Sequence, residues 1–223
     1  MQIQTENQLV AELAKGLKKT FHTDIAIQEF SAGYGIADLA FAKDFFTNNN
    51  SINRKPINNY YALKSFLSLP NDTLFTVEDV IRISGTSKYI SREIIQLLAV
   101  GDYIVKDGRK YFKKVNTILN PIKKLIAIEA KIKDWKQGVL QARRYKSYTD
   151  ECYLAILSNY ETNIDYSYLD RHDIGLILFN QKNGEIYFKR KPSQNSFLSF
   201  YEESMGLFAK ELFLHQVISL KFH

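Results

Sequence analysis

The chain has 223 residues, 45% of them apolar and 24% charged, which excludes an intrinsically disordered protein and allows one large domain or two small ones. Its formal charge of +6 favours polyanionic partners, and its single cysteine excludes a disulfide framework and a cysteine-based zinc site. The polar start lacks a signal-peptide pattern and no apolar run approaches the roughly 20 residues that cross a bilayer, so we expect a cytoplasmic protein without membrane contact.

A helix and two strands are expected first. Thr5 and Gln8 have the spacing of a capping box, and apolar residues follow them at helical spacing. Residues 24–30 alternate polar and apolar side chains, which predicts a strand, and a glycine-rich turn leads into a second strand over residues 35–42. The two strands are expected to form a hairpin.

The composition changes after a polar stretch that ends near residue 59. The pattern predicts helices over residues 60–69, 76–84 and 87–100. Short strands are expected after them, over residues 103–105 and 110–113. Asp107-Gly108, between the two strands, is a favoured hairpin turn. From Lys55 to Lys114 there are ten basic and six acidic residues, so +4 of the chain's +6 lies in this section.

The remaining chain again alternates strands and helices. Strands are expected over residues 125–133, 151–157, 175–179 and 185–189, and helices over residues 134–148, 161–173 and 196–220. Cys152 lies within an expected buried strand and is predicted to pack in the core. Mixed helices and strands favour an α/β fold with a central mixed sheet flanked by helices.

Three charged residues lie within expected strands that are otherwise mostly apolar. Glu129 and Lys131 point to one face because side chains alternate along a strand, and Asp38 has small neighbours on its own face. If the two strands are sheet neighbours, Asp38 and Glu129 meet with Lys131 beside them. Paired carboxylates repel unless a cation neutralises them, and oxygen ligands, with the Ala130 carbonyl as a further one, suit Mg²⁺ or Mn²⁺. A lysine there would position and deprotonate a water for attack on a phosphodiester.

The order Asp38 … Glu129-Ala130-Lys131, on elements in the order helix–strand–strand–strand–helix–strand, resembles the PD-(D/E)xK nuclease superfamily. The resemblance covers roughly residues 5–42 and 120–190. It implies a restriction-endonuclease-like core in which Asp38 and Glu129 bind the metal and Lys131 acts at the attacking water. The sequence departs from the motif at Ala37, where the family name places proline.

The resemblance also implies supporting residues. Members often carry a glutamate on the first helix. Glu6 is preferred for this role because it is almost in line with Leu13 on a 3.6-residue helix, whereas Glu12 points well away from Leu13. Glu6 is alternatively only a first-turn acid favoured by the helix dipole. Some members carry a glutamine and a tyrosine on the helix after the E-x-K strand, for which Gln141 and Tyr145 are the candidates, with Arg144 on the same face.

Residues 55–115 resemble a winged helix-turn-helix domain inserted into a core formed by residues 1–54 and 116–223. Its third helix would enter a major groove of duplex DNA, and its hairpin would contact phosphates. The side chains expected at this interface are Lys88, Tyr89, Arg92, Lys106, Arg109 and Lys110. Winged helices also serve as protein-contact or dimer modules.

The sequence therefore predicts a Mg²⁺-dependent DNA endonuclease that hydrolyses phosphodiester bonds. Many enzymes of this fold work as dimers, so a homodimer is consistent with it. An alternative interpretation is that Glu129 and Lys131 form a simple ion pair at the solvated end of a strand and have no catalytic role. The competing functions are a non-cleaving DNA-binding or regulatory protein on the same scaffold, and a subunit of a larger defence or transposition complex.

Overall fold

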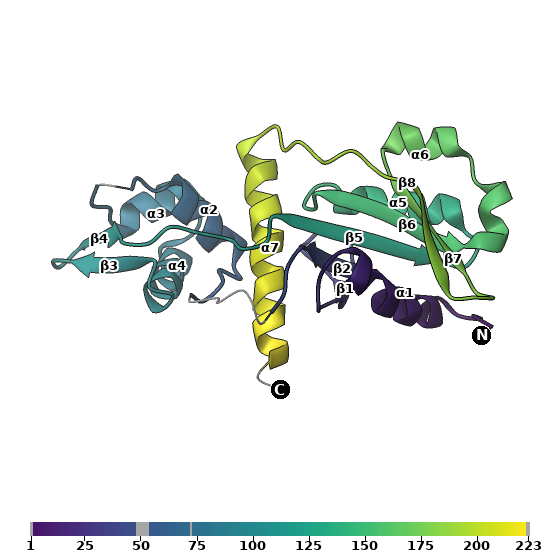
Figure 1. The fold of residues 1–223 in the computed structure, drawn as a ribbon. Helices are drawn as coiled ribbons and strands as arrows, with labels where there is room; N and C mark the ends of the chain where they lie inside the picture. The colour runs from purple at the N-terminus through teal and green to yellow at the C-terminus, as the bar shows by residue number, and fades with distance from the viewer. Residues whose placement is uncertain (1, 48–53, 72, 222–223) are drawn as a thin grey trace. The chain divides into compact units, whose positions relative to one another are not determined.

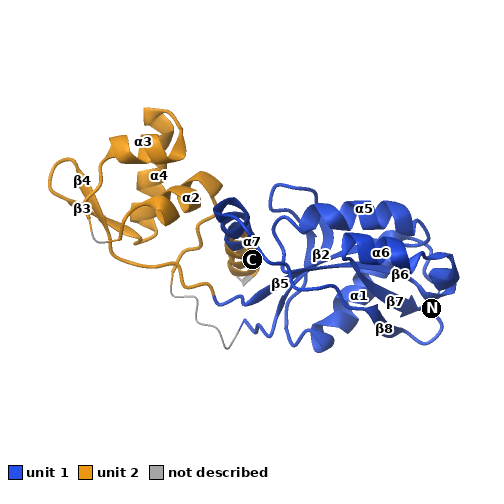
Figure 2. Cartoon of the chain, turned by 90° about the horizontal axis from the view of Figure 1, so that it is seen from above, with its two compact units in different colours: residues 1–51, 121–209 blue, residues 52–120, 210–223 orange. Residues whose placement is uncertain are grey.

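The computed structural model describes residues 2–47, 54–71 and 73–221 and contains both helices and strands (Figure 1). The chain divides into two compact units (Figure 2). The first contains residues 1–51 and 121–209, and the second contains residues 52–120 and 210–223. Residues 210–223 thus group with the second unit, whereas the sequence placed them with the core over residues 116–223.

A mixed sheet forms the centre of the first unit. Six strands of the described residues lie in the order β1-β2-β5-β6-β7-β8. Their bounds are Ile27–Phe30 (β1), Ala37–Lys43 (β2), Lys124–Lys131 (β5), Glu151–Leu157 (β6), Gly175–Asn180 (β7) and Glu185–Arg190 (β8). Neighbours β5, β6 and β7 run parallel, and the other neighbouring pairs are antiparallel, including the predicted hairpin of β1 and β2. The predicted α/β fold with a central mixed sheet is confirmed.

Helices cover both faces of this sheet (Figure 1). Helix α1 (Glu6–Thr20) begins with the predicted capping box of Thr5 and Gln8, and its apolar side packs on Phe41 and Ile128 of the sheet. Helix α5 (Trp135–Tyr145) covers the opposite face. The sheet is therefore buried on both faces, as its nearly continuous apolar strands require.

The predicted helix over residues 161–173 is wrong in its extent. The structure has a 3₁₀ helix over Ser158–Asn163 and a separate α-helix, α6, over Tyr166–His172. Ile164 between them is extended, and the Asp165 side chain accepts a hydrogen bond from the backbone N–H of Ser167. A new N-cap at Asp165 thus starts α6 where one continuous helix was expected.

Gly138 allows α5 to lie close to the sheet. A glycine inside a helix costs about 1 kcal/mol relative to alanine, so it needs a packing reason. A Cβ atom at this position would lie 2.5 Å from Cδ1 of Leu154 and 2.9 Å from Cγ of Lys131. The missing side chain therefore makes room for the stem of Lys131 under the helix.

The second unit combines helices, a hairpin and the end of the last helix. Its elements are α2 (Tyr60–Ser68), α3 (Val77–Ser84), α4 (Lys88–Val100), β3 (Ile104–Asp107), β4 (Tyr111–Lys114) and residues 210–221 of α7 (Phe200–Lys221). Thr76 and Asp79 form a capping box at the start of α3, and Gly85 ends that helix with a left-handed conformation. Gly108 has a φ of 76°, as the predicted hairpin turn requires.

A buried carboxylate organises the second unit. The Glu211 side chain is fully buried and accepts hydrogen bonds from the Arg54 guanidinium at 2.5 and 2.7 Å. It also accepts from the backbone N–H of Ile57 at 2.9 Å and from the Asn120 side chain at 2.8 Å. These donors replace the water that the buried charge loses.

Candidate functional site

Asp38 and Glu129 come together across two neighbouring strands. In the antiparallel pair of β2 and β5, Leu39 lies opposite Ile128, and continuing this register by one residue places Asp38 opposite Glu129. The Oδ2 atom of Asp38 accepts a hydrogen bond of 2.7 Å from the backbone N–H of Ala130. The two carboxylates therefore share the face of the sheet that α5 covers.

Lys131 joins these carboxylates to the first helix. Its Nζ atom lies 2.8 Å from Oε1 of Glu129 and 3.2 Å from Oε2 of Glu6. Glu129 is only 1% exposed and Lys131 only 7% exposed. The alternative of a solvated ion pair at a strand end is therefore wrong, because both charges are removed from water and depend on each other.

Tyr145 of α5 contacts the buried glutamate from the other side. Its hydroxyl lies 2.5 Å from Oε2 of Glu129 and 2.7 Å from the backbone carbonyl of Ile36. A hydroxyl has one hydrogen, so it donates to one of these oxygens at a time. When Glu129 carries a proton, it donates to the tyrosine, which then donates to Ile36. When Glu129 is ionised, Tyr145 donates to the carboxylate.

Gln141 lies one helical turn before Tyr145. Within the described part of the chain, its buried Oε1 atom has no hydrogen-bond partner. A buried acceptor without a donor costs stability, so it needs an explanation. This amide is available to accept a hydrogen bond from a bound molecule.

Burial, with repulsion from neighbouring carboxylates, disfavours the charged forms of both Asp38 and Glu129. Desolvation raises the pKa of Asp38, against the Ala130 hydrogen bond and the Lys131 charge that lower it. Desolvation and the neighbouring Asp38 raise the pKa of Glu129. Burial alone would lower the pKa of Lys131, but its contacts with Glu129 and Glu6 outweigh burial and raise it. Lys131 therefore keeps its ammonium at neutral pH.

The chemistry of these residues suits a hard divalent cation. Asp38 and Glu129 offer carboxylate oxygens. Their pKa values are raised first by burial and then by neighbouring carboxylates, and a bound cation would offset both effects. In the ranges 2–47, 54–71 and 73–221, no group of three or more His, Cys, Asp or Glu side chains is already arranged to hold a metal ion. In this conformation Glu129 is instead hydrogen-bonded by Lys131 and Tyr145.

Glu29 is a neighbour of the site that the sequence reasoning missed. The register of β1 and β2 pairs Gln28 with Leu39 and Phe30 with Ala37, so Glu29 lies across from Asp38. Its charge contributes to the raised pKa of Asp38. Glu29 has a φ of 51°, which is uncommon for a residue other than glycine. Alternation in the sequence carries no signal of a left-handed residue within a strand.

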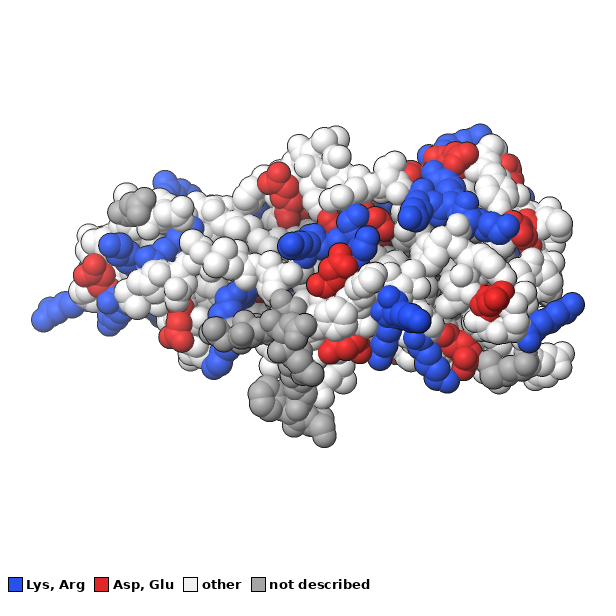
Figure 3. Space-filling view, viewed as in Figure 1, with Lys and Arg blue, Asp and Glu red and all other residues white. Residues whose placement is uncertain are grey.

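The residues predicted to bind DNA all lie on α4 and on the hairpin of the second unit. Each of the six is exposed: Lys88, Tyr89, Arg92, Lys106, Arg109 and Lys110. Lys88 lies 4.0 Å from Glu78, and Tyr89 is hydrogen-bonded to Glu93. Figure 3 shows basic side chains spread over the visible face of this unit, with fewer acidic ones among them.

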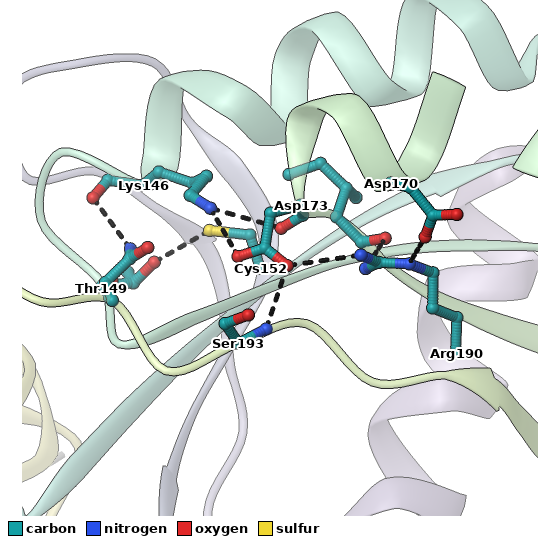
Figure 4. Close-up of polar contacts among 9 residues, drawn as sticks. Lys146, Thr149, Cys152, Asp170, Asp173, Arg190 and Ser193 are labelled. Atoms are coloured by element: carbon teal, nitrogen blue, oxygen red, sulfur yellow. Dashed lines mark hydrogen bonds and ion pairs between the residues drawn. The ribbon is translucent and has the colours of Figure 1, made fainter. Parts of the chain in front are cut away.

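The first unit contains a second polar cluster, which Figure 4 shows. Asp173 accepts hydrogen bonds from Lys146 at 2.9 Å, from Arg190 at 3.3 Å and from the backbone N–H of Ser193 at 2.9 Å. It precedes the amino end of β7, whereas Glu129 lies near the carboxyl end of the parallel strand β5. Ligands of open α/β sheets bind outside the carboxyl ends of strands, so the cluster around Asp173 is structural.

Cys152 belongs to that structural region. It is buried, and its sulfur lies 3.0 Å from the hydroxyl of Thr149 (Figure 4). Burial raises the pKa of the thiol to about 12. The thiol therefore stays protonated at neutral pH and is a poor nucleophile.

The fold and the site define an α/β protein whose mixed sheet carries a buried glutamate, a buried lysine and a partly buried aspartate under a helix. No family model, no curated protein and no solved structure matches the chain. Its function is therefore argued from its own residues. No helix in the described part of the chain is both long enough and apolar enough to span a membrane.

Proposed function

We propose that the protein is a metal-dependent DNA endonuclease of the PD-(D/E)xK type. The observation that carries the proposal is the convergence of Asp38, Glu129 and Lys131, from two strands, on one buried face of the sheet. Burying Glu129 and Lys131, with Asp38 partly buried beside them, is costly, and the same apolar strands would be more simply filled by apolar side chains. Such groups are typical of sites that perform chemistry.

Asp38 and Glu129 would hold Mg²⁺ or Mn²⁺, with the Ala130 carbonyl as a further oxygen donor. The ion, when bound, supplies charge neutralisation at the phosphate and lowers the pKa of a coordinated water. The Ala130 N–H orients Asp38 by donating a hydrogen bond to its Oδ2 atom, so Oδ1 would be the oxygen that binds the ion. Tyr145 and Lys131 orient Glu129 by bonding one oxygen atom each.

Lys131 acts as a hydrogen-bond donor in this proposal. Because its pKa is raised, it is an ammonium at neutral pH and does not remove the proton from a water. It donates to Glu129 and Glu6, and its remaining hydrogen is available to a phosphate oxygen or to the attacking water. Glu6 accepts a hydrogen bond from the same ammonium. Within the described residues the amide oxygen of Gln141 has no donor, and it would accept a hydrogen bond from a water.

The second unit would act as a winged helix that binds duplex DNA. Its order of α2, α3, α4 and a hairpin matches that of a winged helix-turn-helix. Arg92, Lys106, Arg109 and Lys110 are exposed, and no ion pair engages them within the described residues. Four free cations on a helix and its neighbouring hairpin are suited to phosphate contacts.

One observation favours a second candidate, a DNA-binding protein of the same scaffold that does not cleave. Both carboxylate oxygens of Glu129 are engaged, by Lys131 and by Tyr145. A metal ion would have to displace one of these partners or share an oxygen with it. If neither occurs, the buried polar groups serve only to stabilise the fold.

Incubation of the protein with plasmid and single-stranded DNA, in Mg²⁺ or Mn²⁺, tests the proposal. We expect cleavage that requires the metal and is lost in Lys131→Ala. The matched control is Lys133→Ala, because Lys133 is an exposed lysine two residues further along the chain. Cleavage that survives Lys131→Ala contradicts the proposed site, and DNA binding without any cleavage by the wild type supports the second candidate.

A further inference from the structure

The loop that joins β1 to β2 carries two large exposed side chains and leads directly into the strand of Asp38. Tyr34 is 62% exposed and Ile36 is 60% exposed. Ile36 directly precedes β2 and stands two residues before Asp38. A single isolated apolar residue on a surface needs no explanation, but two in one short loop next to a polar site indicate a contact surface.

The loop is held against the site by direct contacts. The Tyr145 hydroxyl links the Ile36 carbonyl to the Glu129 carboxylate. Gly33 and Gly35 have φ values of 107° and 84°, which other residues rarely adopt. A Cβ atom at Gly35 would lie 3.0 Å from the Tyr145 ring, so the backbone lies directly on α5 there. Tyr34 is therefore carried by a loop of defined conformation.

A cation lies next to the same loop. The stem of Arg144 passes 3.5 Å from the position of a Cβ atom at Gly35. Arg144 is exposed, and it forms no ion pair within the described residues. Tyr34 adjoins Gly35 along the chain, so an exposed aromatic residue and an exposed cation belong to backbone segments that lie against each other. Proteins bind single-stranded nucleic acid with this combination of side chains, because bases stack on the ring while cations follow the phosphates.

We infer that Tyr34, Ile36 and Arg144 form a binding site for an unpaired nucleotide of DNA next to the scissile phosphate. The inference rests on the proposed nuclease function and names its substrate class, which is DNA whose strands are separated at the cleavage point. Bases within a duplex are covered on both faces by their neighbours. A tyrosine at this position stacks only on a base that has left the duplex, as in a single strand or a frayed end.

Fluorescence of 2-aminopurine tests this site without any cleavage. Short single-stranded DNA oligonucleotides that carry one 2-aminopurine are titrated with the full chain in EDTA, and stacking on Tyr34 quenches the signal. We expect Tyr34→Ser to lose the quenching and to bind about tenfold more weakly, as expected for one base–aromatic stack. Tyr34→Phe keeps both properties. Tyr201→Ser, at another exposed tyrosine of the first unit, leaves both unchanged.

Several outcomes would overturn the site. These are unchanged quenching in Tyr34→Ser, an equal loss in Tyr201→Ser, equal quenching by a blunt duplex, or tighter binding of the same strand made of RNA. Other outcomes distinguish a failure of the nuclease function from a failure of the nucleotide site. A wild type that quenches but does not cleave in Mg²⁺ overturns the nuclease and supports the nucleotide site. A wild type that cleaves while Tyr34→Ser still quenches normally overturns the nucleotide site alone.

Discussion

The backbone N–H of Ala130 donates a hydrogen bond of 2.7 Å to the side chain of Asp38. Because Ala130 stands between Glu129 and Lys131, this bond ties the carboxylate of β2 to the segment of β5 that carries the other two charged groups. The relative positions of Asp38, Glu129 and Lys131 are thus set by the pairing of two strands, which is more rigid than a loop.

Asp38→Asn should stabilise the protein at neutral pH. The raised pKa of Asp38 means that the folded state binds its proton more tightly than the unfolded state, so ionisation of Asp38 opposes folding. The wild type therefore loses stability as the pH rises through the folded pKa, and the asparagine variant does not. Melting temperatures of the two proteins should differ at neutral pH and converge near pH 4, about the ordinary pKa of an aspartate. A variant that is less stable throughout would contradict the burial argument.

Lys131→Met should destabilise the protein because it leaves Glu129 buried without its cation. Removing one partner of a buried pair costs about 3 kcal/mol. The double variant Lys131→Met with Glu129→Gln should recover most of this loss, because the unpaired charge is then gone. Urea unfolding measures both changes. If the double variant is as unstable as the single one, packing of the lysine stem dominates over its charge.

Tyr145→Phe should lower the affinity for Mn²⁺ by about 10- to 100-fold, since residues that orient a ligand typically have effects of this size. The free energy of unfolding of the Tyr145→Phe variant should fall by only about 1 kcal/mol, the net contribution of one hydrogen bond. Mn²⁺ titration by calorimetry and thermal melting separate the two effects.

Tyr148→Phe is the matched control. Within the described residues the buried hydroxyl of Tyr148 has no hydrogen-bond partner, so its removal should leave stability unchanged or slightly increased and metal affinity unaffected. Equal losses of affinity in the two variants would show that Tyr145 acts only through packing.

Arg109→Ala should weaken duplex binding equally for all sequences. A phosphate contact releases a counterion, so its loss should reduce the slope of log K against log salt by about 1. Lys15→Ala, in the first unit, removes a cation that is already paired with Glu12 and should leave the slope unchanged. Binding by fluorescence anisotropy over a range of salt concentrations measures the slope. An unchanged slope in Arg109→Ala would place the duplex elsewhere.

Local signals account for the parts of the fold that the sequence predicted. The capping box at Thr5 and the glycine turn at Gly108 depend on neighbours along the chain, so they are visible without tertiary information. Alternation likewise assigned Asp38 and Glu129 to definite faces. Their approach required only that β2 and β5 be neighbours in the sheet.

Other features depend on contacts that no local pattern encodes. The hydroxyl of Tyr145 reaches Glu129 because Gly138 lets α5 approach the sheet, which is a property of packing. The left-handed conformation of Glu29 follows from its place in the hairpin and not from its residue type. The grouping of residues 210–223 with the second unit goes with the burial of Glu211, which looks, in the sequence, like an ordinary helical glutamate.

The pairing of Arg54 with Glu211 has a consequence for biosynthesis. These residues are 157 positions apart, so the guanidinium leaves the ribosome long before its carboxylate has been translated. Until then, the nascent second unit lacks its central anion and stays incompletely packed. We expect this unit to mature only after translation passes residue 211, and ribosome-stalled chains that end earlier to remain sensitive to protease there.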